Sequence, residues 1–87
     1  MLVLNGNGRQ GAAGSEASHL RSLGYPPATT GNALRTDYAT SLVMYRPGYL
    51  PEARRLAHDL HVKLVGPLDG LRPSSLKGSQ VVEILGT

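Results

Sequence analysis

The sequence predicts an α/β fold of the α+β type: a two-layer sandwich in which a mixed sheet carries two helices on one face. Three observations lead to this prediction. Short apolar runs alternate with two segments of helical periodicity, the pattern of β-α-β units. The first half of the chain resembles the second half after a shift of forty positions, and a last apolar run follows both halves. The predicted order is β-α-β, β-α-β and one added strand, in a ferredoxin-like or similar sandwich.

The length and composition indicate one small domain, 1–87. Because the chain enters a strand almost at Met1, we expect it to be a domain excised from a longer protein. The sequence has no cysteine, which excludes disulfides and thiol chemistry. Its net charge of +3 is mild and the positive residues are scattered, which argues against nucleic acid as a partner. No apolar run is long enough to cross a membrane.

The first unit begins with a buried strand over Leu2–Leu4. A helix is expected over about 10–23, with Ala13, Ala17 and Leu20 on its apolar face. Gly24 is expected to follow the helix as its C′ residue, and two prolines come next. The polar stretch 28–34 predicts a weak strand at the edge of the sheet.

The second unit repeats this order. A strand is expected over Leu42–Tyr45, a helix over Pro51–Leu60 and a strand over Val62–Val65. A loop rich in turn-forming residues covers 66–75, and Val81–Leu85 forms the final strand. In this last strand Glu83 alternates with apolar residues, which predicts that one face of the sheet meets solvent or a partner.

The glycines of "LVLNGNGRQGAAG" raise the question of a nucleotide site. Gly6, Gly8 and Gly11 spell G-x-G-x-x-G between a strand and a helix, as in dinucleotide-binding proteins. The acidic residue that holds the ribose about twenty positions later is missing, and the chain is too short for two half-folds. We therefore expect no NAD or FAD and no other cofactor, and keep a small-ligand or nucleotide site at the Gly6–Gly11 loop as the alternative function.

Two other interpretations of this loop remain open. The glycines can serve a tight corner, because they adopt positive φ angles; Gly8 recurs as Gly48 in the second unit. The loop can also bind an anion through backbone N–H groups at a helix start, with side-chain contacts from Asn5, Asn7 and Arg9.

No catalytic or metal-binding constellation is evident in the sequence. His58 and His61 lie close together near the end of the second helix, with Asp59 between them. No third strong ligand is spaced to join the two histidines. Three serines recur on the first helix, and no His–acid pair is evident beside them. We therefore expect no metal site, no catalytic residues and no enzymatic activity.

A family resemblance extends over nearly the whole chain. The motifs that carry it are Asn5-Gly6, Gly11, Leu20 with Gly24-Tyr25, Gly31-Asn32-Ala33, Tyr38, Tyr45-Arg46-Pro47-Gly48 and the closing "VVEILG". In this combination and spacing they resemble the C-terminal domain of LytR-CpsA-Psr proteins. The sequence departs from the family pattern at "YPPATT", where apolar strand residues are usual.

The resemblance implies an extracytoplasmic module of the bacterial cell envelope, from a membrane-anchored protein whose anchor precedes this domain. It implies a non-catalytic role, accessory to cell-wall polymer attachment or envelope integrity. The expected partner is an anionic wall polymer or another envelope protein. The residues expected to form the ligand or partner surface come from the glycine loop and from one face of the last strand: Asn5, Gly6, Asn7, Gly8, Arg9, Val81, Glu83 and Leu85.

Overall fold

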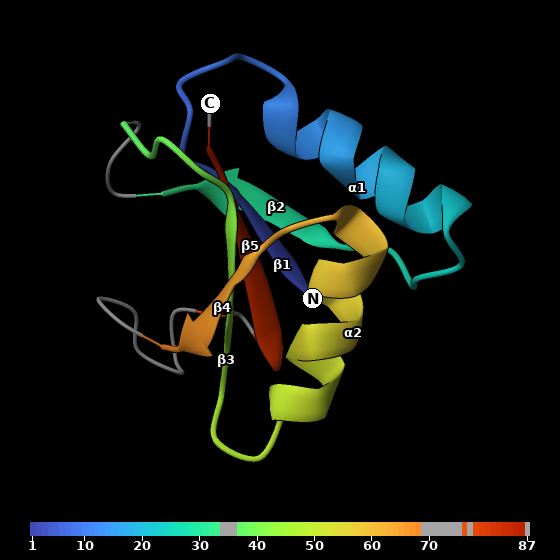
Figure 1. Ribbon diagram of the computed structural model, residues 1–87. Helices are drawn as coiled ribbons and strands as arrows, with labels where there is room; N and C mark the ends of the chain where they lie inside the picture. The colour runs from blue at the N-terminus through green and yellow to red at the C-terminus, as the bar shows by residue number, and fades with distance from the viewer. Residues whose placement is uncertain (34–36, 69–75, 77, 87) are drawn as a thin grey trace.

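The fold is a five-stranded mixed sheet with two helices on one face (Figure 1). The computed structural model describes residues 1–33, 37–68, 76 and 78–86. In chain order its elements are β1 (Leu2–Asn5), α1 (Ala12–Ser22), β2 (Thr29–Asn32), β3 (Leu42–Tyr45), α2 (Leu50–Leu60), β4 (Leu64–Pro67) and β5 (Val81–Leu85). The predicted fold class is confirmed.

The last strand occupies the centre of the sheet, whose order is β2-β1-β5-β3-β4. β1 runs parallel to β2 and to β5, whereas β3 runs parallel to β4 and antiparallel to β5. The two β-α-β units thus lie on either side of β5 and point in opposite directions, as two copies related by a half-turn about an axis through β5. Because the two strands of each unit are direct neighbours, the sheet differs from the split units of a ferredoxin-like fold.

Both helices lie on the same face of the sheet, one over each half, and leave β5 between them. α1 packs on β1 and β2, and α2 packs on β3 and β4. The apolar layer beneath the helices draws on both units and on β5; its buried members are Val3, Ala13, Leu20, Val43, Ala53, Leu56, Ala57, Val81 and Leu85. Burial of apolar surface contributes about 25 cal/mol for each Å² removed from water. Because both units share this buried layer, it stabilises their association.

The opposite face of the sheet is also buried. Leu2, Leu4, Met44, Leu76, Val82 and Ile84 form a second apolar cluster there. Tyr38 and Leu68 pack against it from the connecting segments, and Leu42 packs against it from the start of β3. Every residue of β5 is therefore buried, and the prediction that one face of this strand meets solvent or a partner is wrong. The reason is its central place, where each face of the strand is covered by a separate layer.

The boundaries of the elements follow from local backbone geometry. α1 begins at Ala12 and not at Gln10, because Gly11 adopts a left-handed conformation with φ 81°. The expected C′ role of Gly24 is confirmed: its φ is 94° and its N–H donates to the Arg21 carbonyl. β4 begins two residues later than expected, since the Val62 N–H still donates to the Ala57 carbonyl at the end of α2.

The expected edge position of the strand after α1 is confirmed, although this strand spans only Thr29–Asn32. The last expected residue of that strand, Leu34, and most of the predicted loop 66–75 lie outside the described residues. In the part of the chain that the structure describes, neither helix combines the length and the hydrophobicity that crossing a membrane requires.

Candidate functional site

The loop between β1 and α1 is held in shape by its own asparagines. The Asn5 side chain donates to the Arg9 carbonyl at 2.6 Å and accepts from the Asn7 N–H at 3.1 Å. The Asn7 side chain accepts from the Arg9 N–H at 2.8 Å and donates to the Gly86 carbonyl at 3.2 Å. Both side chains are thus engaged within the protein, where they form two successive turns that end at the exposed Arg9. Anion contacts from these asparagines stay a prediction.

The three glycines of the loop have separate structural roles. A Cβ at Gly6 would lie 2.7 Å from Tyr38 and Ile84 side-chain atoms and 2.8 Å from the Leu85 carbonyl oxygen, so glycine is needed for close packing. Gly8 and Gly11 have φ angles of 74° and 81°, in the left-handed region that favours glycine. These roles account for the G-x-G-x-x-G pattern without a nucleotide, so no observation now favours the alternative nucleotide site.

A hollow of about 470 Å³ lies at the start of α1. It is lined by Asn7, Arg9, Gln10, Gly11, Ala12, Ser15, Glu16 and Leu85. Arg9 and the helix start favour an anion, whereas the Glu16 carboxylate opposes one. Of the expected surface residues, the loop side of this hollow brings together Asn7, Arg9 and Leu85.

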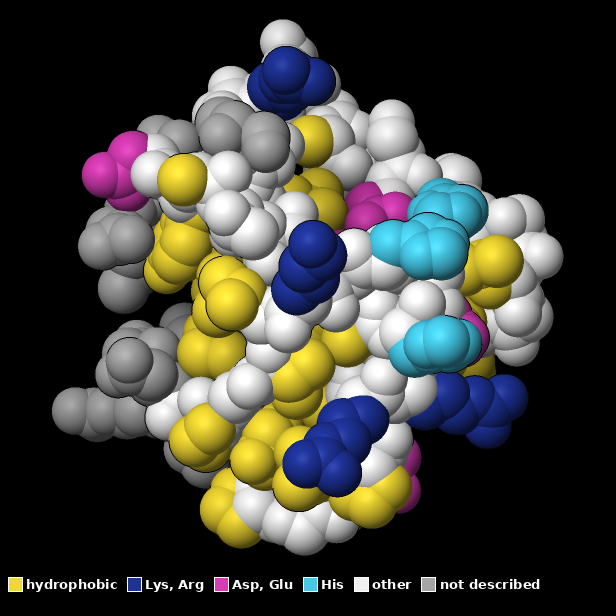
Figure 2. Space-filling view, in the orientation of Figure 1, with side chains coloured by type: hydrophobic (Ala, Val, Ile, Leu, Met, Phe, Trp, Pro, Cys, Tyr) yellow, Lys and Arg dark blue, Asp and Glu magenta, His cyan; other side chains and the backbone are white. Residues whose placement is uncertain are grey.

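A second hollow, of about 380 Å³, lies between the two helices above β5. It is lined by Glu16, Ala39, Thr40, Ser41, Leu60, His61, Val62, Lys63 and Glu83, and we call it the helix groove. Figure 2 shows acidic side chains recessed beside histidine side chains on this face of the molecule. Glu16 lines both hollows, so the two adjoin along α1.

The edge of the helix groove is positioned by the end of β5. The Gly86 N–H donates to the Ser41 hydroxyl oxygen at 2.9 Å. A Cβ at Gly86 would lie 2.3 Å from the Thr40 carbonyl carbon, so only glycine permits this close approach. The segment that carries Thr40 and Ser41 is thereby fixed beside Glu83.

Glu83 is the most unusual residue of the helix groove. It is 1% exposed in the middle of the central strand, paired with Val3 on one side and with Val43 on the other. Burial raises the pKa of its carboxyl from the ordinary 4.5 to about 9, and the hydrogen bond and negative charge of Glu16 add to the effect. Glu83 therefore carries a proton at neutral pH. Its Oε1 is buried and has no hydrogen-bond partner within the described part of the chain.

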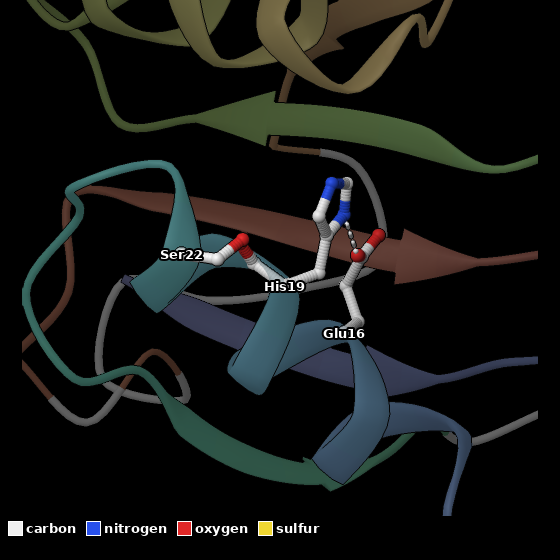
Figure 3. Close-up of polar contacts among 3 residues, drawn as sticks. All are labelled: Glu16, His19 and Ser22. Atoms are coloured by element: carbon white, nitrogen blue, oxygen red, sulfur yellow. Dashed lines mark hydrogen bonds and ion pairs between the residues drawn. The ribbon is translucent and has the colours of Figure 1, made fainter.

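Glu16, which interacts with the buried Glu83, also contacts His19 at the surface of α1 (Figure 3). His19 Nδ1 lies 3.0 Å from Glu16 Oε1, and the His19 side chain is 54% exposed. The expectation that no His–acid pair lies beside the serines is wrong, because Glu16 and His19 are three residues apart and share a helix face. Ser22 does not complete a catalytic triad, since its hydroxyl donates to the His19 backbone carbonyl at 2.6 Å.

The histidines near the end of α2 have no cluster of further ligands around them among the described residues. Across residues 1–33, 37–68, 76 and 78–86, no group of three or more His, Asp or Glu side chains could hold a metal ion. The Asp59 carboxylate accepts a hydrogen bond from the Tyr25 hydroxyl, which joins α2 to the segment that follows α1. Burial, together with this bond, raises the pKa of Tyr25.

The structure thus divides the predicted surface residues. Asn7, Arg9 and Leu85 line the first hollow, and Glu83 lines the helix groove. Val81, Glu83 and Leu85 are buried beneath the helices, at 8%, 1% and 8% exposure, so the expected open surface on β5 is wrong. The sequence analysis missed Glu16 and Lys63 as groove residues. For Glu16 a signal exists: it interrupts the apolar periodicity of a helix whose polar residues otherwise face solvent.

Comparison with known proteins agrees with the resemblance stated from the motifs. No curated protein and no solved structure matches this chain. Residues 1–86 match the family model LytR_C, described as LytR cell envelope-related transcriptional attenuator, and because the match spans essentially the whole domain, the chain belongs to this family.

Proposed function

We propose that this domain is a non-catalytic binding module of an extracytoplasmic bacterial cell-envelope protein, accessory to cell-wall polymer attachment or envelope integrity. The observation that carries the proposal is the family match over residues 1–86. The two adjoining hollows along α1 support it, because together they offer an elongated polar surface between rigid elements. A membrane anchor in the longer protein would hold the domain near its ligand.

The absence of an evident catalytic constellation in the described residues supports binding without turnover. The Ser22 hydroxyl donates to the His19 backbone carbonyl, so this serine is not aligned with the His19–Glu16 pair as a nucleophile. Glu83 is protonated and deeply buried, so it is unsuited to act as a base at neutral pH.

Arg9 is the residue best placed to recognise an anionic wall polymer. It is exposed, lines the hollow at the start of α1 and is held outward by the two asparagine turns. A phosphate or carboxylate at this point would also meet the positive end of α1. Recognition of a partner protein through the outer face of β5 has lost its support, because that strand is buried.

The test is co-sedimentation of the purified domain with wall fragments that keep or lack their anionic polymer. We expect retention on the intact fragments, weaker retention at higher ionic strength, and a several-fold loss in Arg9→Ala. Arg54→Ala is the matched control, since Arg54 is exposed on α2 and lines neither hollow. An equal loss in both variants would assign the effect to net charge alone. No retention of the wild-type domain on any wall fraction would overturn the proposed function.

A further inference from the structure

We infer that the helix groove binds a primary ammonium group, which the carboxyl groups of Glu83 and Glu16 hold. This inference goes beyond the proposed function, since it assigns to the helix groove a ligand group of opposite charge to the anion proposed for Arg9. Three observations in the groove carry it: an unpartnered buried acceptor, the balance of charge and the set of surrounding oxygen atoms.

The unpartnered acceptor is Glu83 Oε1. A buried polar atom without a hydrogen bond costs about 1–3 kcal/mol, so native proteins rarely leave one without a reason. Glu83 is 1% exposed, yet it lines a hollow of about 380 Å³. The hollow therefore adjoins the Glu83 side chain, whereas Oε1 itself is out of contact with solvent in the free groove. A core position in the central strand would otherwise be filled by an apolar residue, as at Val3 and Val43 on either side.

The charges around the groove favour one added positive charge. With both carboxyls ionised, Glu16 and Glu83 contribute two negative charges and Lys63 one positive charge, so one negative charge remains. His19 on α1 pairs with Glu16 at the surface, and His61 lines the groove after α2. A single proton on Glu83 neutralises the remaining charge, and a single ammonium group would do the same. The pKa of Glu83 is raised first by burial and then by the hydrogen bond and negative charge of Glu16, so a cation beside the two carboxyls would oppose the last of these effects.

The side chains that line the groove supply the oxygen acceptors that an ammonium group needs. An ammonium has three N–H donors and no acceptor. Glu83 and Glu16 supply carboxylate oxygens from the floor and from α1. Thr40 and Ser41 add hydroxyl groups at the edge, where the bond from Gly86 holds the Ser41 oxygen in place. A ligand lacking donors, such as a carboxylate or a phosphate, would leave Glu83 Oε1 unpartnered and meet two acidic side chains.

Ammonium binding must displace the proton of Glu83. The free groove holds this proton at neutral pH, whereas two ionised carboxylates pair best with the cation. Each binding event therefore releases about one proton at pH 7. The affinity should rise as the pH increases from about 6 to about 8, because the proton then competes less well.

The experiment uses two amines of different origin: a lysine side chain in a capped single-residue amide, and glucosamine. Each has its N-acetylated form as a neutral control. Binding is followed by chemical-shift changes of groove backbone amides and by calorimetry in buffers of different ionisation enthalpy. We expect at least one amine to bind with release of about one proton, and neither acetylated form to bind. The amine that binds identifies a peptide or an amino-sugar source.

Glu83→Gln is the decisive variant, because it keeps the shape of the side chain and removes the ionisable group. We expect it to weaken amine binding by about tenfold or more and to abolish the proton release. Glu52→Gln is the matched control, since Glu52 is exposed in the first turn of α2 and should leave both measurements unchanged. Unfolding melts of both variants show that the loss does not come from misfolding.

Three outcomes would overturn the inference: no amine binding, equal binding of the acetylated forms, or unchanged binding in Glu83→Gln. These failures are distinguishable from failure of the proposed function. If the domain sediments with wall fragments but binds no amine, only the ammonium inference fails. If it binds an amine and no wall fraction, the envelope role fails instead.

Discussion

The two β-α-β units of this domain share a backbone plan but differ at the positions that build the groove. Gly8 and Gly48, forty positions apart, have φ angles of 74° and 92°. Both corners also begin alike, because the Gly6 N–H donates to the Leu85 carbonyl and the Arg46 N–H donates to the Gln80 carbonyl. Each unit is thus attached to one end of β5 by the same kind of bond.

The two units differ in the residues at two pairs of matching positions, 6 and 46 and 16 and 56. Position 6 must be glycine because Tyr38, Ile84 and Leu85 crowd it, whereas the matching position 46 carries an arginine. Glu16 corresponds to Leu56, which is 1% exposed in the core of the second unit. Where α2 packs an apolar side chain, α1 presents a carboxyl to Glu83. The places where the repeat breaks therefore mark the candidate site.

The largest effect is expected from removing the strand that both units share. Deletion of 80–87 takes away β5, which pairs with β1 and β3 and is buried along its whole length. Two units without a common strand have too small a core to fold cooperatively. We expect no cooperative transition in a denaturant melt and poor dispersion in the NMR spectrum. A well-dispersed spectrum from the truncated chain would show that one unit folds without β5.

The second prediction concerns Glu83, the β5 residue that Glu16 of the first unit contacts. Its folded pKa of about 9 lies above the ordinary 4.5, so the folded state binds a proton that the unfolded state has lost between these values. This stabilisation is complete below about pH 4.5 and is lost as the pH rises through about 9. Urea melts of the wild type should show unfolding free energy falling by about 1 kcal/mol per pH unit from about pH 6 to about pH 8. Glu83→Gln should remove this slope, and parallel slopes in the two proteins would contradict the prediction.

The third prediction compares the two corner positions that differ. Gly6→Ala should destabilise the domain by about 1–3 kcal/mol, because the added methyl group overpacks against Tyr38, Ile84 and the β5 backbone. Arg46→Ala, its counterpart in the repeat, should change stability by less than about 0.5 kcal/mol. Thermal and urea melts measure both. Similar losses at the two positions would show that the first corner is no more tightly packed than the second.

The smallest expected difference is between the two corner positions that agree. Gly8→Val and Gly48→Val should each cost about 1–2 kcal/mol, since each places a β-branched residue at a positive φ. The repeat predicts that these two losses are similar. A melt unchanged by either substitution would show that that corner does not need glycine.

Much of the local structure was predictable because its signals are local. Apolar periodicity placed both helices, and Gly24 marked the end of α1. α1 and β4 each begin two residues later than predicted, because one left-handed glycine and one hydrogen bond decide these starts. The candidate site was predicted only in part. Arg9 followed from a motif, whereas the partnership of Glu16 with Glu83 joins residues from separate elements.

The sequence by itself determined the two repeated β-α-β units and the glycines that turn their corners, since periodicity and φ preferences act within a few residues. Only the tertiary structure decided where β5 lies. The alternation of Val81, Glu83 and Leu85 is typical of a strand with one face open, yet β5 inserts between β1 and β3 and is covered on both faces. Strand pairing between distant segments depends on the burial of the whole sheet, and that burial placed a carboxyl in the core, opposite Glu16.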